Sequence, residues 1–106
     1  METIHSSVGV NGANQKQDVG VVQHLLNLSG SKRGIPKQVL LVDGIAGPKT
    51  VGAIREFQTK FCKVVDGKLM PGGETITRLN EIAGPIPPAN DGISFLTPSD
   101  PNTNIA

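Results

Sequence analysis

The chain has 106 residues, of which 37% are hydrophobic but only 3% are aromatic, with no Trp and no Tyr. This length allows one compact domain and a tail around a small aliphatic core, and the composition excludes the large aromatic faces that sugar and nucleobase sites commonly present. The net charge of +1 gives no electrostatic basis for binding nucleic acid or a membrane surface, and no apolar run approaches the ~20 residues of a transmembrane helix.

The first predicted element is an extended lead-in with turns over residues 1–17, which are rich in Gly, Asn, Ser and Gln. Asp18 then has the side chain of a helix N-cap and is predicted to start the first helix. Apolar residues follow at helical spacing: Val19, Val22, Leu25 and Leu26. Gln23 and Asn27 interrupt this stripe. The helix is expected to end near residues 29–30.

The second helix is predicted to begin at a well-marked entry turn. A polar connection over residues 30–38 leads to VLLV at 39–42, which is expected to be a short extended piece or a buried turn. Asp43-Gly44 is a turn signal. Gly47 suits the N-cap, and Pro48 suits the first helical position because its missing N–H would have no partner there. The helix is therefore expected to start at Pro48.

This second helix is the clearest amphipathic segment of the chain. Its apolar stripe consists of Val51, Ala53, Ile54, Phe57 and Phe61. Its predicted solvent side carries Lys49, Arg55, Glu56 and Lys60. We expect the stripe to form a large part of the core.

A looser copy of the entry turn begins at Asp66 and predicts the third helix. Gly73 lies near its N-cap, and Glu74 is an acidic residue where the helix dipole favours one. The apolar positions of this helix are Ile76, Leu79 and Ala83. Gly84-Pro85 is expected to end it. The two Asp-Gly units are thus predicted to be the helix-entry turns of a pseudo-repeat.

The composition changes after residue 84. Residues 85–106 hold five of the eight prolines and few apolar residues, which is typical of an extended linker or tail. Its ISFL segment either packs back on the helices or belongs to a further part of the protein. The predicted organisation is a domain over 1–84 and a Pro-rich linker or tail over 85–106.

Catalytic patterns are missing from the sequence. A nucleophile with its base, a metal cluster and a placed carboxylate pair are the usual signatures of a small enzyme, and none occurs at diagnostic spacing. His5 and His24 are isolated, and no H-E-x-x-H or C-x-x-C occurs. The sequence predicts no cofactor, no metal site and no catalytic residue, and a hydrolase ranks behind two non-catalytic interpretations.

Three segments together resemble the small peptidoglycan-binding domain that is often attached to bacterial and phage cell-wall hydrolases. They are DVGVVQHLLN, VDGIAGPKTVGAIREFQ and DGKLMPGGETITRLN, and the resemblance covers roughly residues 8–84. The most specific string is D-G-x-x-G-P-x-T-x-x-A-I-x-x-F-Q, matched here by Asp43, Gly44, Gly47, Pro48, Thr50, Ala53, Ile54, Phe57 and Gln58. The resemblance implies an all-α, three-helix domain that recognises peptidoglycan.

The resemblance also points to a shallow groove between the second and third helices. Arg55, Gln58, Thr75 and Arg78 are the expected ligand-binding residues, offering donors to a stem peptide or to acetamido sugars. A solvated helix face is an equally strong interpretation of these four residues. Most of the motif residues are instead expected to shape turns and fill the core.

Two functions remain open from the sequence. The first is a non-catalytic wall-binding module that targets a fused or associated wall-active protein, such as a phage endolysin or a contact-dependent secretion effector. The second is a docking module on a secretion or phage particle that keeps the scaffold without wall binding. The start of the chain lacks a signal-peptide pattern, so we expect synthesis in the cytoplasm and delivery to the cell wall or periplasm by another route.

Overall fold

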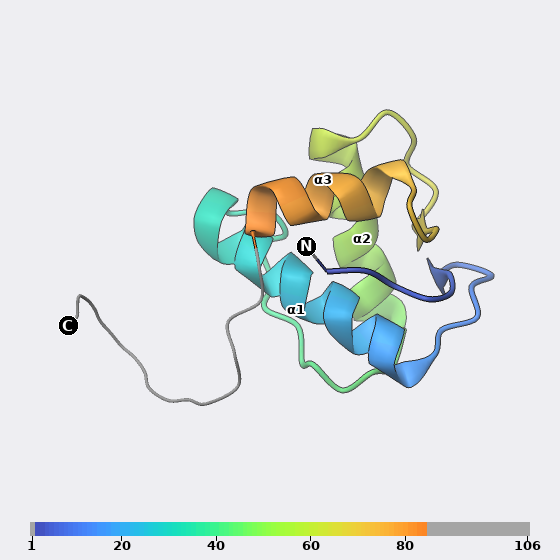
Figure 1. Cartoon of the computed structure of the whole chain (residues 1–106). Helices are drawn as coiled ribbons and strands as arrows, with labels where there is room; N and C mark the ends of the chain where they lie inside the picture. The colour runs from blue at the N-terminus through green and yellow to red at the C-terminus, as the bar shows by residue number, and fades with distance from the viewer. Residues whose placement is uncertain (1, 85–106) are drawn as a thin grey trace.

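A computed structural model describes residues 2–84 (Figure 1). Its elements, in chain order, are strand β1 (Val8–Gly9), helix α1 (Lys16–Arg33), helix α2 (Pro48–Phe61), strand β2 (Lys68–Leu69) and helix α3 (Glu74–Ala83). The two short strands pair antiparallel, with Val8 opposite Leu69. The prediction of an all-α, three-helix domain is confirmed. The predicted linker or tail over 85–106, including ISFL, lies outside the described residues.

Helix α1 is longer than predicted at both ends. It continues past residues 29–30 because Gly34, with φ 76°, provides the left-handed C-cap and donates its N–H to the Gly30 carbonyl at 2.8 Å. Gly30 lies inside the helix, where the chain around Pro36 packs closely against it. A Cβ at this position would lie 2.7 Å from the Pro36 carbonyl oxygen, so the returning chain passes directly against the helix backbone.

The predicted N-cap role of Asp18 is wrong. The N-cap is Gln15, which forms no side-chain cap bond, and Asp18 is a buried residue of the first turn. Its carboxylate accepts the N–H groups of His5 and Ser6, each at 3.0 Å, and thereby fastens the N-terminal segment to α1. An aspartate directly before an apolar run fits a helix N-cap, but the sequence does not reveal that its carboxylate will bind the backbone of another segment instead.

The starts of α2 and α3 follow the prediction. Gly47 and Gly73 are the N-caps, Pro48 is the first residue of α2, and Glu74 is the first residue of α3. Both caps lack a side-chain bond because glycine has no side chain to offer. Within α2, Lys49, Arg55 and Lys60 are exposed and Glu56 is half-exposed, as predicted.

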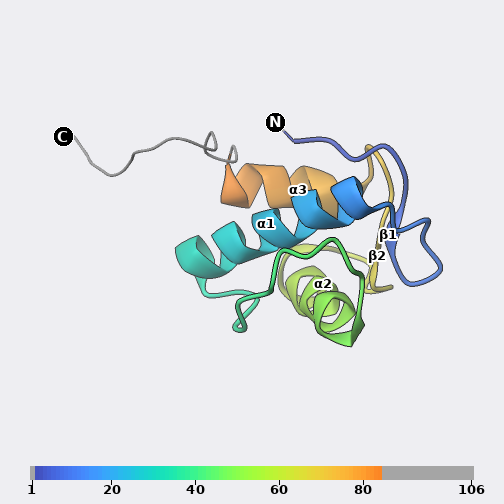
Figure 2. The ribbon, with the colours of Figure 1, turned by 90° about the horizontal axis from the view of Figure 1, so that it is seen from below.

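The core lies where α1 packs against both other helices. Viewed from below, α1 lies between α3 and α2 (Figure 2). The core residues are Ile4, Val8, Val19, Val22, Leu25, Leu26, Leu40, Ala53, Ile54, Phe57, Leu69, Ile76, Leu79 and Ala83. Phe57 is the largest of them, and its ring centroid lies 4.9 Å from that of the half-buried Phe61. The aliphatic core with few aromatic residues matches the prediction.

Residues 39–42 do not form the buried turn that was one of two expectations. Only Leu40 is buried, whereas Val39 and Leu41 are 86% and 77% exposed. Asn27 explains the position of Leu40, because its side-chain amide donates to the Leu40 carbonyl at 2.8 Å and accepts the Leu40 N–H at 2.7 Å. Exposed and buried side chains alternate over residues 39–41, as in an extended chain, whereas Val42 is exposed as well, and the segment forms no strand.

The attachment of the N-terminal segment predicts how stability depends on pH. Burial raises the pKa of Asp18, but hydrogen bonds from the His5 and Ser6 N–H groups and the interaction with the His5 ring outweigh it and leave this pKa below the ordinary value of 3.8. A carboxyl with a lowered pKa in the folded state stabilises the fold at neutral pH, and this contribution is lost as the pH falls through that pKa.

We therefore expect Asp18→Asn to be less stable than the wild type at pH 7 and to lose less stability on acidification to about pH 3. Urea unfolding at both pH values measures this difference. Glu2→Gln, which changes a carboxyl that forms no hydrogen bond or ion pair among residues 2–84, is the matched control and should keep the wild-type pH dependence. An unchanged pH dependence in Asp18→Asn would contradict the proposed role of this carboxylate.

Candidate functional site

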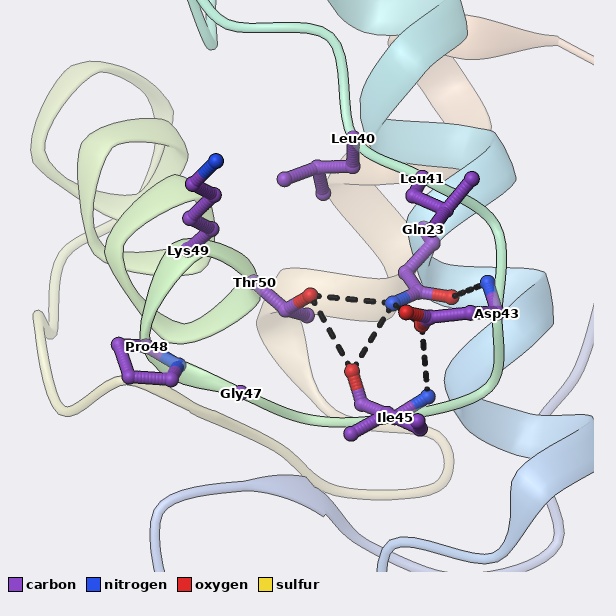
Figure 3. A pocket seen from close by; sticks show the side chains of 9 residues that line it. All are labelled: Gln23, Leu40, Leu41, Asp43, Ile45, Gly47, Pro48, Lys49 and Thr50. Carbon is purple, nitrogen blue, oxygen red and sulfur yellow. Dashed lines mark hydrogen bonds between the residues drawn. The ribbon is translucent and has the colours of Figure 1, made fainter.

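A buried glutamine on α1 holds the turn that precedes α2 (Figure 3). The Gln23 amide nitrogen lies within hydrogen-bond distance of three acceptors, Asp43 Oδ1 at 2.9 Å, the Ile45 carbonyl at 3.0 Å and Thr50 Oγ1 at 3.0 Å, which share its two hydrogens. Its oxygen accepts the N–H groups of Asp43 and Gly44 at 3.1 and 3.0 Å. One side chain therefore fixes both the turn and the first helical turn of α2.

The same arrangement recurs one element later. The Gln58 amide nitrogen, on α2, likewise shares its two hydrogens among three acceptors, Asp66 Oδ1 at 2.9 Å, the Lys68 carbonyl at 3.1 Å and Thr75 Oγ1 at 3.0 Å. Its oxygen accepts the N–H groups of Asp66 and Gly67 at 3.1 and 2.8 Å. The pseudo-repeat predicted from the Asp-Gly pairs is thus a repeat of a hydrogen-bond network, in which each helix holds the entry turn of the next.

Backbone and charge in the two turns are matched as well. Gly44 and Gly67 have φ values of 75° and 71°, the left-handed region in which glycine carries no steric cost. The side-chain hydrogen bond from glutamine is the main cause that lowers the pKa of Asp43 and of Asp66. Both carboxylates are therefore ionised at neutral pH and act as acceptors.

The first network forms one wall of a hollow of about 460 Å³, here called the α2-entry hollow. It is lined by Gln23, Leu40, Leu41, Asp43, Ile45, Gly47, Pro48, Lys49 and Thr50. In Figure 3, Lys49 and Asp43 lie on opposite sides, with Leu40 and Leu41 along the rim between them. Ile45 is 65% exposed, so the hollow presents apolar surface to solvent.

The second network lines a smaller hollow of about 200 Å³, the α3-entry hollow. Its residues are Gln58, Val64, Asp66, Lys68, Met70, Gly73, Glu74 and Thr75. Two of the four predicted ligand-binding residues, Gln58 and Thr75, belong to it. They are 1% and 7% exposed and bind each other, so their polar atoms serve the fold.

The two predicted arginines lie beside the α3-entry hollow and do not line it. Arg55 is three residues before Gln58 on α2, and Arg78 is three residues after Thr75 on α3, so each neighbours a lining residue on its own helix. Arg55 is exposed. Arg78 is half-exposed and donates to the Phe61 carbonyl at 3.2 Å and to Glu81 at 2.6 Å.

Gln23 is the site residue whose role sequence reasoning missed. The helical pattern presents Gln23 as a polar interruption of an apolar stripe, whereas its side chain is 1% exposed and central to the first network. A signal was present in the chain, because a glutamine on the preceding helix comes before each Asp-Gly pair: Gln23 before Asp43 and Gln58 before Asp66.

The described part of the chain was searched for metal-binding groups, reactive thiols and membrane-spanning helices. Residues 2–84 contain no group of three or more His, Cys, Asp or Glu side chains that could hold a metal ion. The thiol of Cys62 is half-buried, and burial raises its pKa, which is the opposite of an activated nucleophile. Within the same residues, no helix has the length and hydrophobicity to cross a membrane.

The networks predict large effects from substitutions that preserve side-chain size. Gln23→Leu would leave the N–H groups of the turn and the Thr50 hydroxyl without their partner, and we expect the free energy of unfolding to fall by at least about 1–3 kcal/mol. Gln58→Leu should behave similarly. Urea unfolding measures both, with the exposed Gln38→Leu as the control, which is expected to stay within about 0.5 kcal/mol of wild type. A Gln23→Leu protein as stable as that control would show that the network is not stabilising.

Comparison with known proteins agrees with this architecture. The family model described as "Putative peptidoglycan binding domain" matches residues 15–79, which is more than half of the chain and includes both glutamine networks. No match was found among curated proteins or among solved structures. On the strength of the family match, the chain belongs to the peptidoglycan-binding domain family.

Proposed function

We propose that this protein is a non-catalytic peptidoglycan-binding module that targets a fused or associated wall-active protein to the cell wall. A phage endolysin and a contact-dependent secretion effector are the two proposed kinds of wall-active protein. The family match over residues 15–79 is the observation that carries the proposal, because it covers α1, α2 and the first part of α3. The module would act at the cell wall or periplasm.

The proposed contact surface is the joint between α2 and α3. Arg55 and Arg78 each lie about one helical turn from a residue that lines the α3-entry hollow, and each guanidinium is a planar donor suited to the carboxylates and carbonyls of a stem peptide. Gln58 and Thr75 contribute by holding the floor of the hollow. Arg55 carries more of the binding in this proposal, since part of the Arg78 donor capacity is already used by Phe61 and Glu81.

One observation favours the second candidate, a docking module for another protein. Val39, Leu41 and Ile45 are 86%, 77% and 65% exposed and lie within seven residues of one another. Apolar side chains exposed close together are typical of protein contact surfaces. This interpretation requires no retention on the cell wall, so one assay separates the two functions.

The assay is retention on purified sacculi over a series of salt concentrations. We expect wild-type retention to persist at moderate salt and to fall severalfold in Arg55→Ala with Arg78→Ala, because the donors beside the α3-entry hollow are lost. Arg55 is exposed and Arg78 is partly exposed, so the melting curve should change little, by about 1 kcal/mol at most.

The control variant also removes two positive charges, at positions away from the proposed contact surface. Arg33→Ala with Lys60→Ala changes two exposed residues that do not line either entry hollow. Equal losses in the two double variants would mean that bulk charge drives retention and that the contact surface is misplaced. A wild type that is not retained at all would overturn wall binding and favour the docking module.

A further inference from the structure

The α2-entry hollow has the composition of a binding site for a short aliphatic peptide. Its volume of about 460 Å³ falls within the range of small-ligand sites, roughly 300–1,000 Å³. Its walls are aliphatic, formed by Leu40, Leu41, Ile45 and Pro48. No aromatic ring lines it, so it lacks the flat face on which a sugar ring commonly packs. An aliphatic peptide fits these walls better than a glycan does.

Charged groups of both signs lie at opposite sides of the hollow (Figure 3). Lys49 is exposed, and among residues 2–84 its ammonium group forms neither a salt bridge nor a side-chain hydrogen bond. Asp43 uses Oδ1 for the Gln23 amide and the Ile45 N–H, whereas its Oδ2 has no hydrogen-bond partner in the described part of the chain. A ligand with a carboxylate at one end and an N–H or ammonium group at the other is complementary to this pair.

The second copy of the network provides an internal comparison. The residue before the network threonine is Lys49 in the first copy and Glu74 in the second. The α3-entry hollow is less than half as large, at about 200 Å³, and Lys68 occupies the position after Asp-Gly that Ile45 holds in the first copy. The same scaffold therefore supports the larger, more apolar hollow at the entry to α2, with Lys49 in the first turn of the helix, whereas the α3-entry hollow has Glu74 at that position and Lys68 after its Asp-Gly pair.

We propose that the α2-entry hollow binds a short aliphatic peptide with a free carboxylate. The ammonium group of Lys49 pairs with this carboxylate, and the carboxylate of Asp43 accepts a hydrogen bond from an N–H or ammonium group of the same peptide. The inference rests on the proposed function, because stem peptides of the cell wall have this chemistry. It adds a contact site separate from Arg55 and Arg78, and it assigns the peptide, rather than the glycan, to this hollow.

The experiment is an NMR titration of the isotope-labelled full chain. The probes are a stem tetrapeptide with free carboxylates, the same peptide with its carboxylates amidated, and a tetramer of N-acetylglucosamine. We expect the free tetrapeptide to shift backbone signals of residues 40–50 and the other two probes to leave them nearly unchanged. Lys49→Glu, which copies the second network, should weaken tetrapeptide binding about tenfold or more.

Lys60→Glu reverses the same charge on the same helix, away from the hollow, and should keep wild-type affinity. A negative residue in the first turn of α2 also suits the helix dipole, so Lys49→Glu is expected to fold normally. The proposal would be overturned if Lys49→Glu and Lys60→Glu lost the same affinity, or if the amidated peptide bound as well as the free one. It would also be overturned if the shifts were confined to the α3-entry hollow, or if millimolar peptide caused no shifts.

The sacculus assay separates this inference from the proposed function. Retention on sacculi without tetrapeptide shifts in residues 40–50 would leave wall binding in place and refute the assignment of this hollow. Tetrapeptide binding in the hollow without retention on sacculi would support the assignment and refute wall targeting.

Discussion

The fold depends on one interaction made twice: a buried glutamine amide that holds an Asp-Gly turn by its backbone. Each amide binds the two N–H groups of the turn, the carboxylate of its aspartate and the threonine of the following helix. Because α1 supplies Gln23 and α2 supplies Gln58, each helix fixes the start of the next one. A buried polar group without partners is costly, and here the network supplies the partners, so the turns have little freedom to rearrange.

The same constraint creates the candidate binding surfaces. Both hollows lie against a glutamine network, so hydrogen bonds hold their floors, while their rims carry the residues that differ between the two copies. Lys49 and Ile45 give the α2-entry hollow a cation and an apolar rim, whereas the corresponding residues of the α3-entry hollow, Glu74 and Lys68, are an anion and a cation. A scaffold that holds its turns from inside leaves the outer side chains free to determine what is bound.

The sequence predicted what depends on local chemistry. Asp-Gly, Gly-Pro and the spacing of apolar residues are short-range signals, and they placed the starts of α2 and α3 and most of the core correctly. The errors involve partners distant in the chain. Asp18 binds an N-terminal segment 12 and 13 residues away, and Asn27 holds Leu40 from the same distance, so neither role is encoded in local pattern. Of the four predicted ligand-binding residues, Gln58 and Thr75 are buried, whereas Arg55 and Arg78 reach solvent. This difference is also not visible in the local pattern, because the burial of Gln58 and Thr75 depends on the packing of α2 against the turn before α3.

The most direct test of this account is native-state hydrogen exchange at the four turn N–H groups that the glutamines hold. These belong to Asp43, Gly44, Asp66 and Gly67; Asp66 is exposed, and Asp43 and Gly44 are partly exposed. We predict that they exchange slowly, close to the rates of the core amides of α1, because each is bound to a buried side chain that moves only when the helices separate. Exchange as fast as that of the exposed Val39 and Leu41 amides would show that the turns open freely, and would contradict the central role of the two networks.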